Sequence, residues 1–165
     1  MNVEALNSWP EREAEAALLR CCGSWRWVRA MLARRPFANE EAVGHAASEI
    51  EASLQRADWL EAFTAHPRIG DLDSLKKKFA ATATWAEGEQ AGVAGAADEV
   101  LLALAEGNRL YEQRFGHIFI VCATGKSAVE MLTLLRARLP NSPEDELGIA
   151  AAEQAKITRL RLEKL

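Results

Sequence analysis

The apolar and polar positions of the chain follow a helical period over most of its length. Leu101, Leu104, Tyr111 and Phe115 fall on or near one face of a helix that starts near Asp98, as expected for an amphipathic helix with one buried side. Other helices are expected over residues 9–21, 25–35, 59–66, 128–139 and 143–164, with two more from residue 40 and through 87–90. A further helix is opened by Asp71 or Asp73 and reaches about Ala83. The pattern predicts an all-α fold, in one compact multi-helix domain spanning residues 1–165.

Polar residues that favour helix N-termini precede most of these segments. Gly23 can end one helix and Ser24 can cap the next. The capping-box pattern, a polar cap followed three residues later by glutamate, occurs at Asp58 and again at Ser127. The predicted N-caps are Ser8, Ser24, Asn39, Asp58, Ser127 and Ser142.

One segment, residues 117–123, departs from the helical pattern. It is short, rich in β-branched and aromatic residues, and bounded by Gly116 and Gly125. Such a run is typical of an extended, buried stretch. Because no second strong strand pattern exists, the segment is expected to stay extended without forming a sheet.

Composition narrows the function classes. The 165 residues carry a formal net charge of −4, which argues against a nucleic-acid-binding protein with a basic footprint; the lysine run at 76–78 is typical of a solvated helix face. The three cysteines lack metal or redox spacing and are expected to be reduced. No signal peptide or membrane span is predicted, so we expect a cytoplasmic protein that contacts neither membranes nor nucleic acid.

Two common binding motifs are absent. Gly125, Lys126 and Ser127 resemble the end of a phosphate-binding loop, but Ile120 stands where that motif requires a glycine. The three histidines, His45, His66 and His117, lack zinc-site spacing, and no metal is expected.

His66 is the strongest candidate for a site. Pro67 disfavours helical backbone at His66 and fixes its own φ, so the imidazole projects from a stiff junction between two helices. Gly70 permits a tight turn or a close approach to a ligand. The residues alone leave open whether this stretch is a site or a helix connector.

Several short segments along nearly the whole chain form one set. They are Cys22-Gly23-Ser24, His66-Pro67-Arg68-Ile69-Gly70, Glu89-Gln90-Ala91-Gly92, Asn108 to Cys122 with its Phe115-Gly116-x-x-Phe119-Ile120 core, Gly125-Lys126-Ser127-Ala128 and Ile157-x-Arg159-Leu160. Together these segments resemble the OHCU decarboxylase family, where OHCU is 2-oxo-4-hydroxy-4-carboxy-5-ureidoimidazoline. The resemblance implies an all-α, cofactor-free homodimer that releases CO₂ from a urate breakdown product and forms (S)-allantoin.

The resemblance also implies a site. Its catalytic residues would be His66, Glu89 and Arg159. Substrate-binding positions would be Pro67, Gln90, Ile120, Val121, Cys122 and Ala123. Ala86 departs from the family, which often has serine there, so a hydroxyl contact is absent or comes from Thr82 or Thr84.

The implied chemistry suits these residues. The substrate's C=N bond can accept the electrons released with CO₂, a task that a cofactor performs elsewhere. A histidine with a pKa near 6.5 can move the hydroxyl proton, and an arginine fork can hold an oxygen. Two alternatives remain open: a lyase or hydrolase acting on another ureido compound, and a helical interaction module in which His66 is only part of a connector.

Overall fold

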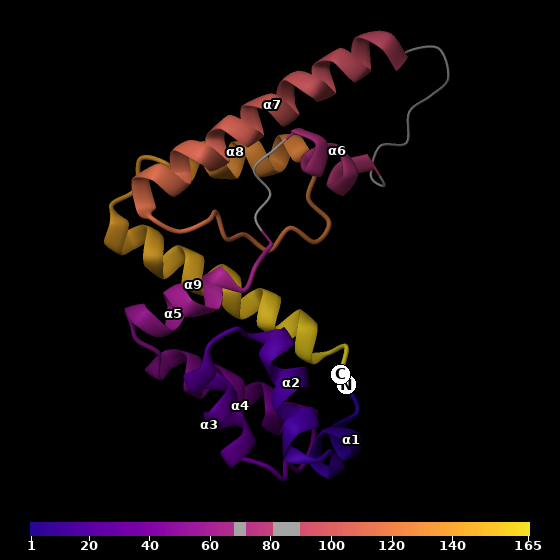
Figure 1. The fold of residues 1–165 in the computed structure, drawn as a ribbon, viewed down its shortest axis with the longest axis vertical. Helices are drawn as coiled ribbons and strands as arrows, with labels where there is room; N and C mark the ends of the chain where they lie inside the picture. The colour runs from indigo at the N-terminus through magenta and orange to yellow at the C-terminus, as the bar shows by residue number, and fades with distance from the viewer. Residues whose placement is uncertain (68–71, 81–89) are drawn as a thin grey trace. The chain divides into compact units, whose positions relative to one another are not determined.

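The structure is a computed structural model that describes residues 1–67, 72–80 and 90–165 (Figure 1). These ranges are helical and contain no strand, which confirms the all-α prediction. The helices are α1 Val3–Ser8, α2 Glu11–Cys21, α3 Trp25–Ala33, α4 Glu40–Ser53, α5 Arg56–Thr64, α6 Leu72–Ala80, α7 Gln90–Phe115, α8 Ala128–Arg138 and α9 Pro143–Leu162.

The chain divides into two compact units. The first holds residues 1–66, 120–122 and 147–165, and the second holds residues 67–119 and 123–146. The single domain expected from the sequence stays a prediction, and the units are described in turn.

The first unit is built around α3, which packs against α2, α4 and α5. Trp27, Val28 and Met31 of α3 are completely buried, and they form one continuous core with Leu6 and Leu18. These side chains form the centre of the unit, because burying large apolar groups is the main favourable term in folding.

A close backbone approach fixes the end of α5 against the turn between α2 and α3. A Cβ atom placed on Gly23 would lie 2.4 Å from the Cβ of Ala65 and 3.4 Å from the carbonyl oxygen of Ala62. Only glycine leaves room for this contact. The approach holds in place the residue that follows Ala65, which is His66.

In the second unit, α7 packs along α8 and against α6 (Figure 1). Leu104 of α7 and Leu135 of α8 are buried, and Gly107 allows the Leu135 side chain to lie against the α7 backbone. At the end of α7 the rings of Tyr111 and Phe115 have centroids 4.6 Å apart, within the range of favourable aromatic pairs.

Four predicted N-caps are confirmed by hydrogen bonds from backbone amides to their side chains. The distances are 3.3 Å at Ser24, 2.8 Å at Asn39, 3.2 Å at Ser127 and 3.1 Å at Ser142. Glu130 completes the predicted box by accepting from the Ser127 amide at 2.8 Å. Residues 117–123 are neither helix nor strand, as expected for the extended segment.

Three helix predictions were wrong. Ser8 is the last residue of α1, a helix that the pattern did not reveal, so α2 starts after Pro10 without a side-chain cap. Asp58 lies inside the first turn of α5, where its carboxylate accepts from the Gln55 amide at 2.8 Å; the box therefore begins three residues earlier than expected. The helices expected through 87–90 and from Asp98 are, from Gln90 onward, the single helix α7, because residues 91–97 are rich in alanine, the strongest helix former.

Candidate active site

His66 lies where α5 ends. Ala65 is the C-cap residue of α5, and the His66 amide donates to the Phe63 carbonyl at 3.2 Å. Pro67 follows and cannot continue the helix. The half-buried imidazole is therefore held by the last turn of α5 and by the approach of Gly23 to Ala65.

The imidazole bonds to a buried amide of α9. His66 Nε2 makes a hydrogen bond with Gln154 Oε1, and Gln154 Nε2 donates to Thr158 Oγ1 at 3.2 Å. Gln154 and Thr158 are both completely buried. The sequence-based prediction missed Gln154; a signal was present in two polar residues one helical turn apart on an alanine-rich helix.

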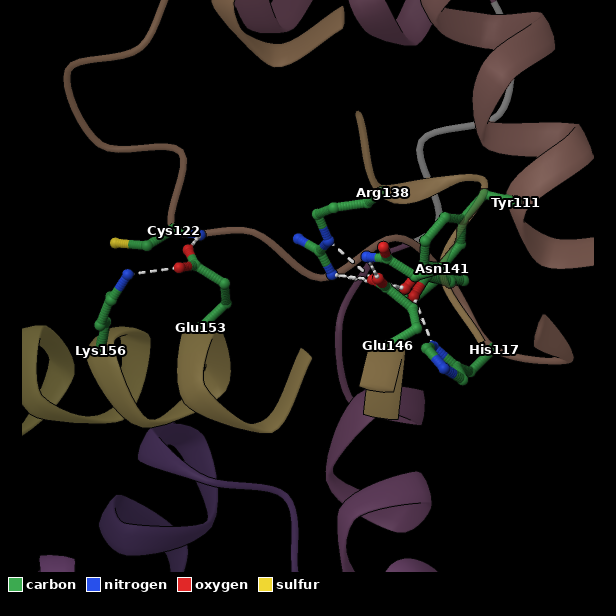
Figure 2. Close-up of polar contacts among 9 residues, drawn as sticks. Tyr111, His117, Cys122, Arg138, Asn141, Glu146, Glu153 and Lys156 are labelled. Atoms are coloured by element: carbon green, nitrogen blue, oxygen red, sulfur yellow. Dashed lines mark hydrogen bonds and ion pairs between the residues drawn. The ribbon is translucent and has the colours of Figure 1, made fainter. Parts of the chain in front are cut away.

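The backbone of residues 120–122 attaches to the same part of α9. The Cys122 amide donates to Glu153 Oε2 at 2.8 Å, and Lys156 pairs with the other oxygen of Glu153 (Figure 2). Ile120 is 2% exposed, and Val121 is half-buried. Because Glu153 precedes Gln154, consecutive residues of α9 hold the extended segment and the imidazole.

Arg159 points away from this group. It follows Gln154 by five residues, so its side chain leaves α9 about 140° around the helix axis. Its guanidinium donates to Ser48 Oγ of α4 at 3.1 Å. Arg159 also lines a surface cavity of about 460 Å³ with His45 and Glu51. The structure therefore does not join Arg159 to the His66–Gln154 contact.

Glu51 is the perturbed carboxyl group of this cavity. Burial raises its pKa to about 7, and the nearby charge of Arg159 opposes that rise. The group therefore titrates near neutral pH beside a fixed cation.

Most of the other predicted site residues lie outside the described residues. Glu89 and Ala86 lie outside the described residues, and so do Thr82, Thr84 and Gly70. Gln90 is the first residue of α7, and only its backbone is described. Pro67 and Ala123 belong to the second unit. The predicted roles of all these residues stay predictions.

A separate polar cluster occupies the second unit. Glu146 accepts from Arg138 Nε at 2.7 Å, from Asn141 Nδ2 at 3.1 Å and from the Tyr111 hydroxyl (Figure 2). The Arg138 guanidinium lies 4.6 Å from the centre of the Phe119 ring. Burial and the contact with Glu146 raise the pKa of Tyr111 far above its usual value. Every group faces a protein partner, so the cluster is structural.

The adjacent cysteines are poor nucleophiles. Cys21 and Cys22 are buried, and desolvation raises the pKa of each thiol to about 11. Across residues 1–67, 72–80 and 98–165, no three His, Cys, Asp or Glu side chains gather in a way that could hold a metal ion.

Comparison with known proteins identifies the family. Residues 7–163 match the sequence profile of OHCU decarboxylases. The chain belongs to the OHCU decarboxylase family. This confirms the resemblance seen in the sequence and the assignment as a decarboxylase, a carboxy-lyase that acts on a small molecule.

Individual members of the OHCU decarboxylase family show how far the similarity extends. The OHCU decarboxylase of Amia calva is 33% identical over 136 residues, which cover 79% of this chain and 74% of that protein. The uric acid degradation bifunctional protein TTL of Arabidopsis thaliana is 41% identical over 147 residues. These cover 88% of this chain but 45% of the plant protein, so the chain spans less than half of that relative.

A solved OHCU decarboxylase has the same fold. Its crystal structure, obtained in the presence of (S)-allantoin, superposes with a TM-score of 0.72 at 38% identity. The match covers 94% of this chain and 97% of that one. Among the described helices of this decarboxylase, none is long and apolar enough to cross a membrane.

Proposed function

We propose that this chain decarboxylates 2-oxo-4-hydroxy-4-carboxy-5-ureidoimidazoline to (S)-allantoin, without a cofactor and with stereospecific protonation, in urate degradation. Family membership and the relative solved with (S)-allantoin support the reaction. The observation that carries it is the imidazole of His66, held at the end of α5 by a buried amide, with residues 120–122 bound to the neighbouring residue of α9.

The reaction needs little from the protein besides orientation and proton transfer. When the bond between the ring carbon and the carboxyl group breaks, its electron pair forms a C=C bond, the C=N electrons move to nitrogen, and that nitrogen takes up a proton, which gives an enol-type intermediate. The hydroxyl group on the ring carbon then gives up its proton and becomes a carbonyl, and the neighbouring carbon accepts a proton on one face. His66 handles the hydroxyl proton, because a histidine titrates near neutral pH.

The other proposed residues bind the rest of the substrate. Glu89 and Gln90 are the proposed partners of the ring and ureido amides, which both donate and accept hydrogen bonds. Backbone groups of residues 120–123 and the ring of Pro67 are the other proposed substrate contacts. Arg159 binds a ureido or ring oxygen rather than the leaving carboxylate, because a strong grip on the carboxylate would stabilise the substrate more than the transition state.

The proposed assembly is a cytoplasmic homodimer. The homodimer rests on the family resemblance alone. Light scattering on the purified chain measures its molar mass directly. A mass of twice 18.1 kDa is expected, and a monomer at assay concentrations would contradict it.

Optical activity of the product tests the proposed reaction. The substrate decays spontaneously to racemic allantoin, so circular dichroism on freshly generated substrate separates enzymatic from spontaneous turnover. The wild-type chain is expected to give (S)-allantoin. An optically inactive product would overturn the proposal, and turnover of a different ureido compound alone would favour the alternative lyase or hydrolase.

Replacing His66 tests its role. His66→Asn is expected to lower kcat by roughly 10²–10⁴-fold, the usual size of general acid–base catalysis. The matched control is His45→Asn, at an exposed position of α4, which is expected to keep wild-type kcat. Wild-type turnover by His66→Asn would remove the imidazole from the mechanism, and a loss confined to His45→Asn would move the site to the cavity that holds Arg159.

A further inference from the structure

Gln154 is an unusual residue to bury. Its amide is completely buried on α9, shortly after the run Ala150-Ala151-Ala152. Burial of an amide costs free energy unless both of its ends are hydrogen-bonded. In the first unit both ends are satisfied, one by His66 and the other by Thr158. The amide therefore links the imidazole to the interior.

The hydrogen bond at the interior end, between Gln154 and Thr158, fixes the orientation of the amide. Gln154 Nε2 donates to Thr158 Oγ1, 3.2 Å away, so the nitrogen end of the amide faces the interior. This leaves the Gln154 carbonyl oxygen facing His66.

The orientation of the Gln154 amide determines the tautomer of the His66 imidazole. A carboxamide oxygen only accepts hydrogen bonds, so the ring nitrogen that contacts it, His66 Nε2, carries the hydrogen. In a neutral imidazole with the hydrogen on Nε2, the lone pair is on Nδ1.

We propose that Gln154 is a positioning residue, which holds neutral His66 as the Nε2–H tautomer so that Nδ1 is the base for the substrate hydroxyl. The second half of this statement rests on the proposed decarboxylase function. In the step itself the substrate O–H bond breaks and an N–H bond forms at Nδ1. The product is an imidazolium whose Nε2–H still bonds to Gln154, and it holds the proton for return to the intermediate.

A neutral partner suits this role better than a carboxylate. A carboxylate at the same place would favour the charged imidazolium and raise the pKa of the histidine. An amide orients the ring without adding a charge, so it does not favour the imidazolium over the neutral base. Gln154→Glu and Gln154→Met therefore change different properties: the first keeps an acceptor and adds charge, and the second keeps the length and removes both polar atoms.

Nitrogen NMR of the resting protein reads the tautomer directly. In ¹⁵N-labelled protein at a pH where the rings are neutral, His66 is expected to show the Nε2–H pattern, with its signals assigned by their absence in His66→Asn. His117 is an internal reference for the opposite tautomer, because its Nδ1 lies 3.0 Å from the Ile118 carbonyl, which can only accept. Gln154→Met is expected to give a mixture of tautomers at His66. An Nδ1–H pattern in the wild type, or an unchanged pattern in Gln154→Met, would overturn the proposal.

Kinetics supply a second readout that a purely structural role would not change. Gln154→Glu is expected to move the acidic limb of the kcat/KM profile to higher pH by roughly one unit. Gln154→Met is expected to lower kcat by roughly 10–100-fold, the range found for outer partners of metal-bound histidines. The control is Gln113→Met, at an exposed position of α7, with wild-type kinetics expected. If Gln154→Met does not fold, the Gln154→Glu profile decides, and an unshifted acidic limb contradicts the proposal.

The two sets of measurements separate this inference from the proposed function. The tautomer is observed without substrate, so a racemic product would remove the reaction and leave the Gln154–His66 result standing. Stereospecific turnover with an Nδ1–H histidine would do the reverse.

Discussion

The two units bury polar clusters of opposite character. The cluster around Gln154 is built from neutral groups and ends at a half-buried imidazole. The cluster around Glu146 contains a buried ion pair with Arg138, in which Glu146 is completely buried and Arg138 is 7% exposed. A ligand or proton can reach the first cluster through the imidazole, whereas the second is closed. This difference separates a candidate reaction site from a structural support, although both contain residues that catalyse reactions elsewhere.

The closed cluster predicts the largest effect on stability. Glu146→Leu leaves the buried Arg138 guanidinium without its partner and removes the acceptor for Tyr111. The free energy of unfolding is expected to fall by about 3–5 kcal/mol, as for other buried pairs that lose one member. Urea unfolding monitored by circular dichroism measures the loss.

The control for Glu146→Leu is Glu106→Leu. Glu106 pairs with Arg109 at 2.7 Å on the exposed face of α7, and removing it is expected to cost about 0–1 kcal/mol. Equal losses in the two variants would show that the buried cluster supports the fold no more than a surface pair does. A change in the His66 tautomer in Glu146→Leu would contradict the separation of the two clusters.

Gly23 in the first unit and Gly107 in the second each allow a close approach, so alanine substitutions at these positions test the two units separately. Gly23→Ala places a methyl group 2.4 Å from the Ala65 Cβ and 3.4 Å from a backbone oxygen, so the end of α5 has to move. A loss of about 1–3 kcal/mol is expected, as for other overpacked sites, together with a lower kcat because His66 moves with α5. Thermal unfolding and the stereospecific assay measure the two effects.

Gly107→Ala is the matched control for Gly23→Ala. Its added methyl group meets the end of the Leu135 side chain, which can change rotamer, so a smaller loss of stability and an unchanged kcat are expected. A larger kcat effect from Gly107→Ala would refute the link between Gly23 and His66.

The sequence predicted the helices well where local signals decide the structure. Ser24, Asn39 and Ser127 cap helices as expected, because a cap depends on residues within one turn. The prediction was wrong at Asp58, whose carboxylate accepts from the amide of the N-cap residue Gln55 and pairs with Arg26 of α3 at 3.2 Å, a contact that the local sequence does not show. It was also wrong about a separate helix start near Asp98, because the alanine-rich residues 91–97 continue α7 back to Gln90.

For the site, the sequence singled out His66 but missed its partner. The His-Pro pair is a local signal, whereas Gln154 lies 88 residues further along the chain and becomes relevant only when α9 meets the end of α5. Arg159 shows the opposite limit. Its neighbourhood in the sequence fits the family pattern, yet the structure places its guanidinium beside Ser48 on another face of α9. A motif identifies the residue, and only the fold gives the direction of the side chain.

The smallest expected effect concerns Glu51, a partly buried carboxyl group that is titratable, unlike the amide of Gln154 and the hydroxyl of Thr158. Its pKa in the folded protein is about 7, above the ordinary value of 4.5, because burial disfavours the charged form. Between these values the folded protein binds the proton more tightly than the unfolded chain does. The contribution of Glu51 to stability is therefore present below pH 4.5 and is lost as the pH rises through 7.

Glu51→Gln tests this sign. The variant lacks the titration, so its free energy of unfolding is expected to exceed that of the wild type at pH 8 by about 1 kcal/mol, less than the full linkage value because the group is partly exposed. At pH 5 the two proteins are expected to differ little.

Arg159→Met removes the charge that opposes the rise in the pKa of Glu51, so it is expected to steepen the loss of stability between pH 5 and 8. If the free energy of unfolding of the wild type and of both variants depends on pH in parallel, the cavity beside α4 is as well hydrated as the surface. Arg159 is then open to a ligand without competition from a buried carboxylate.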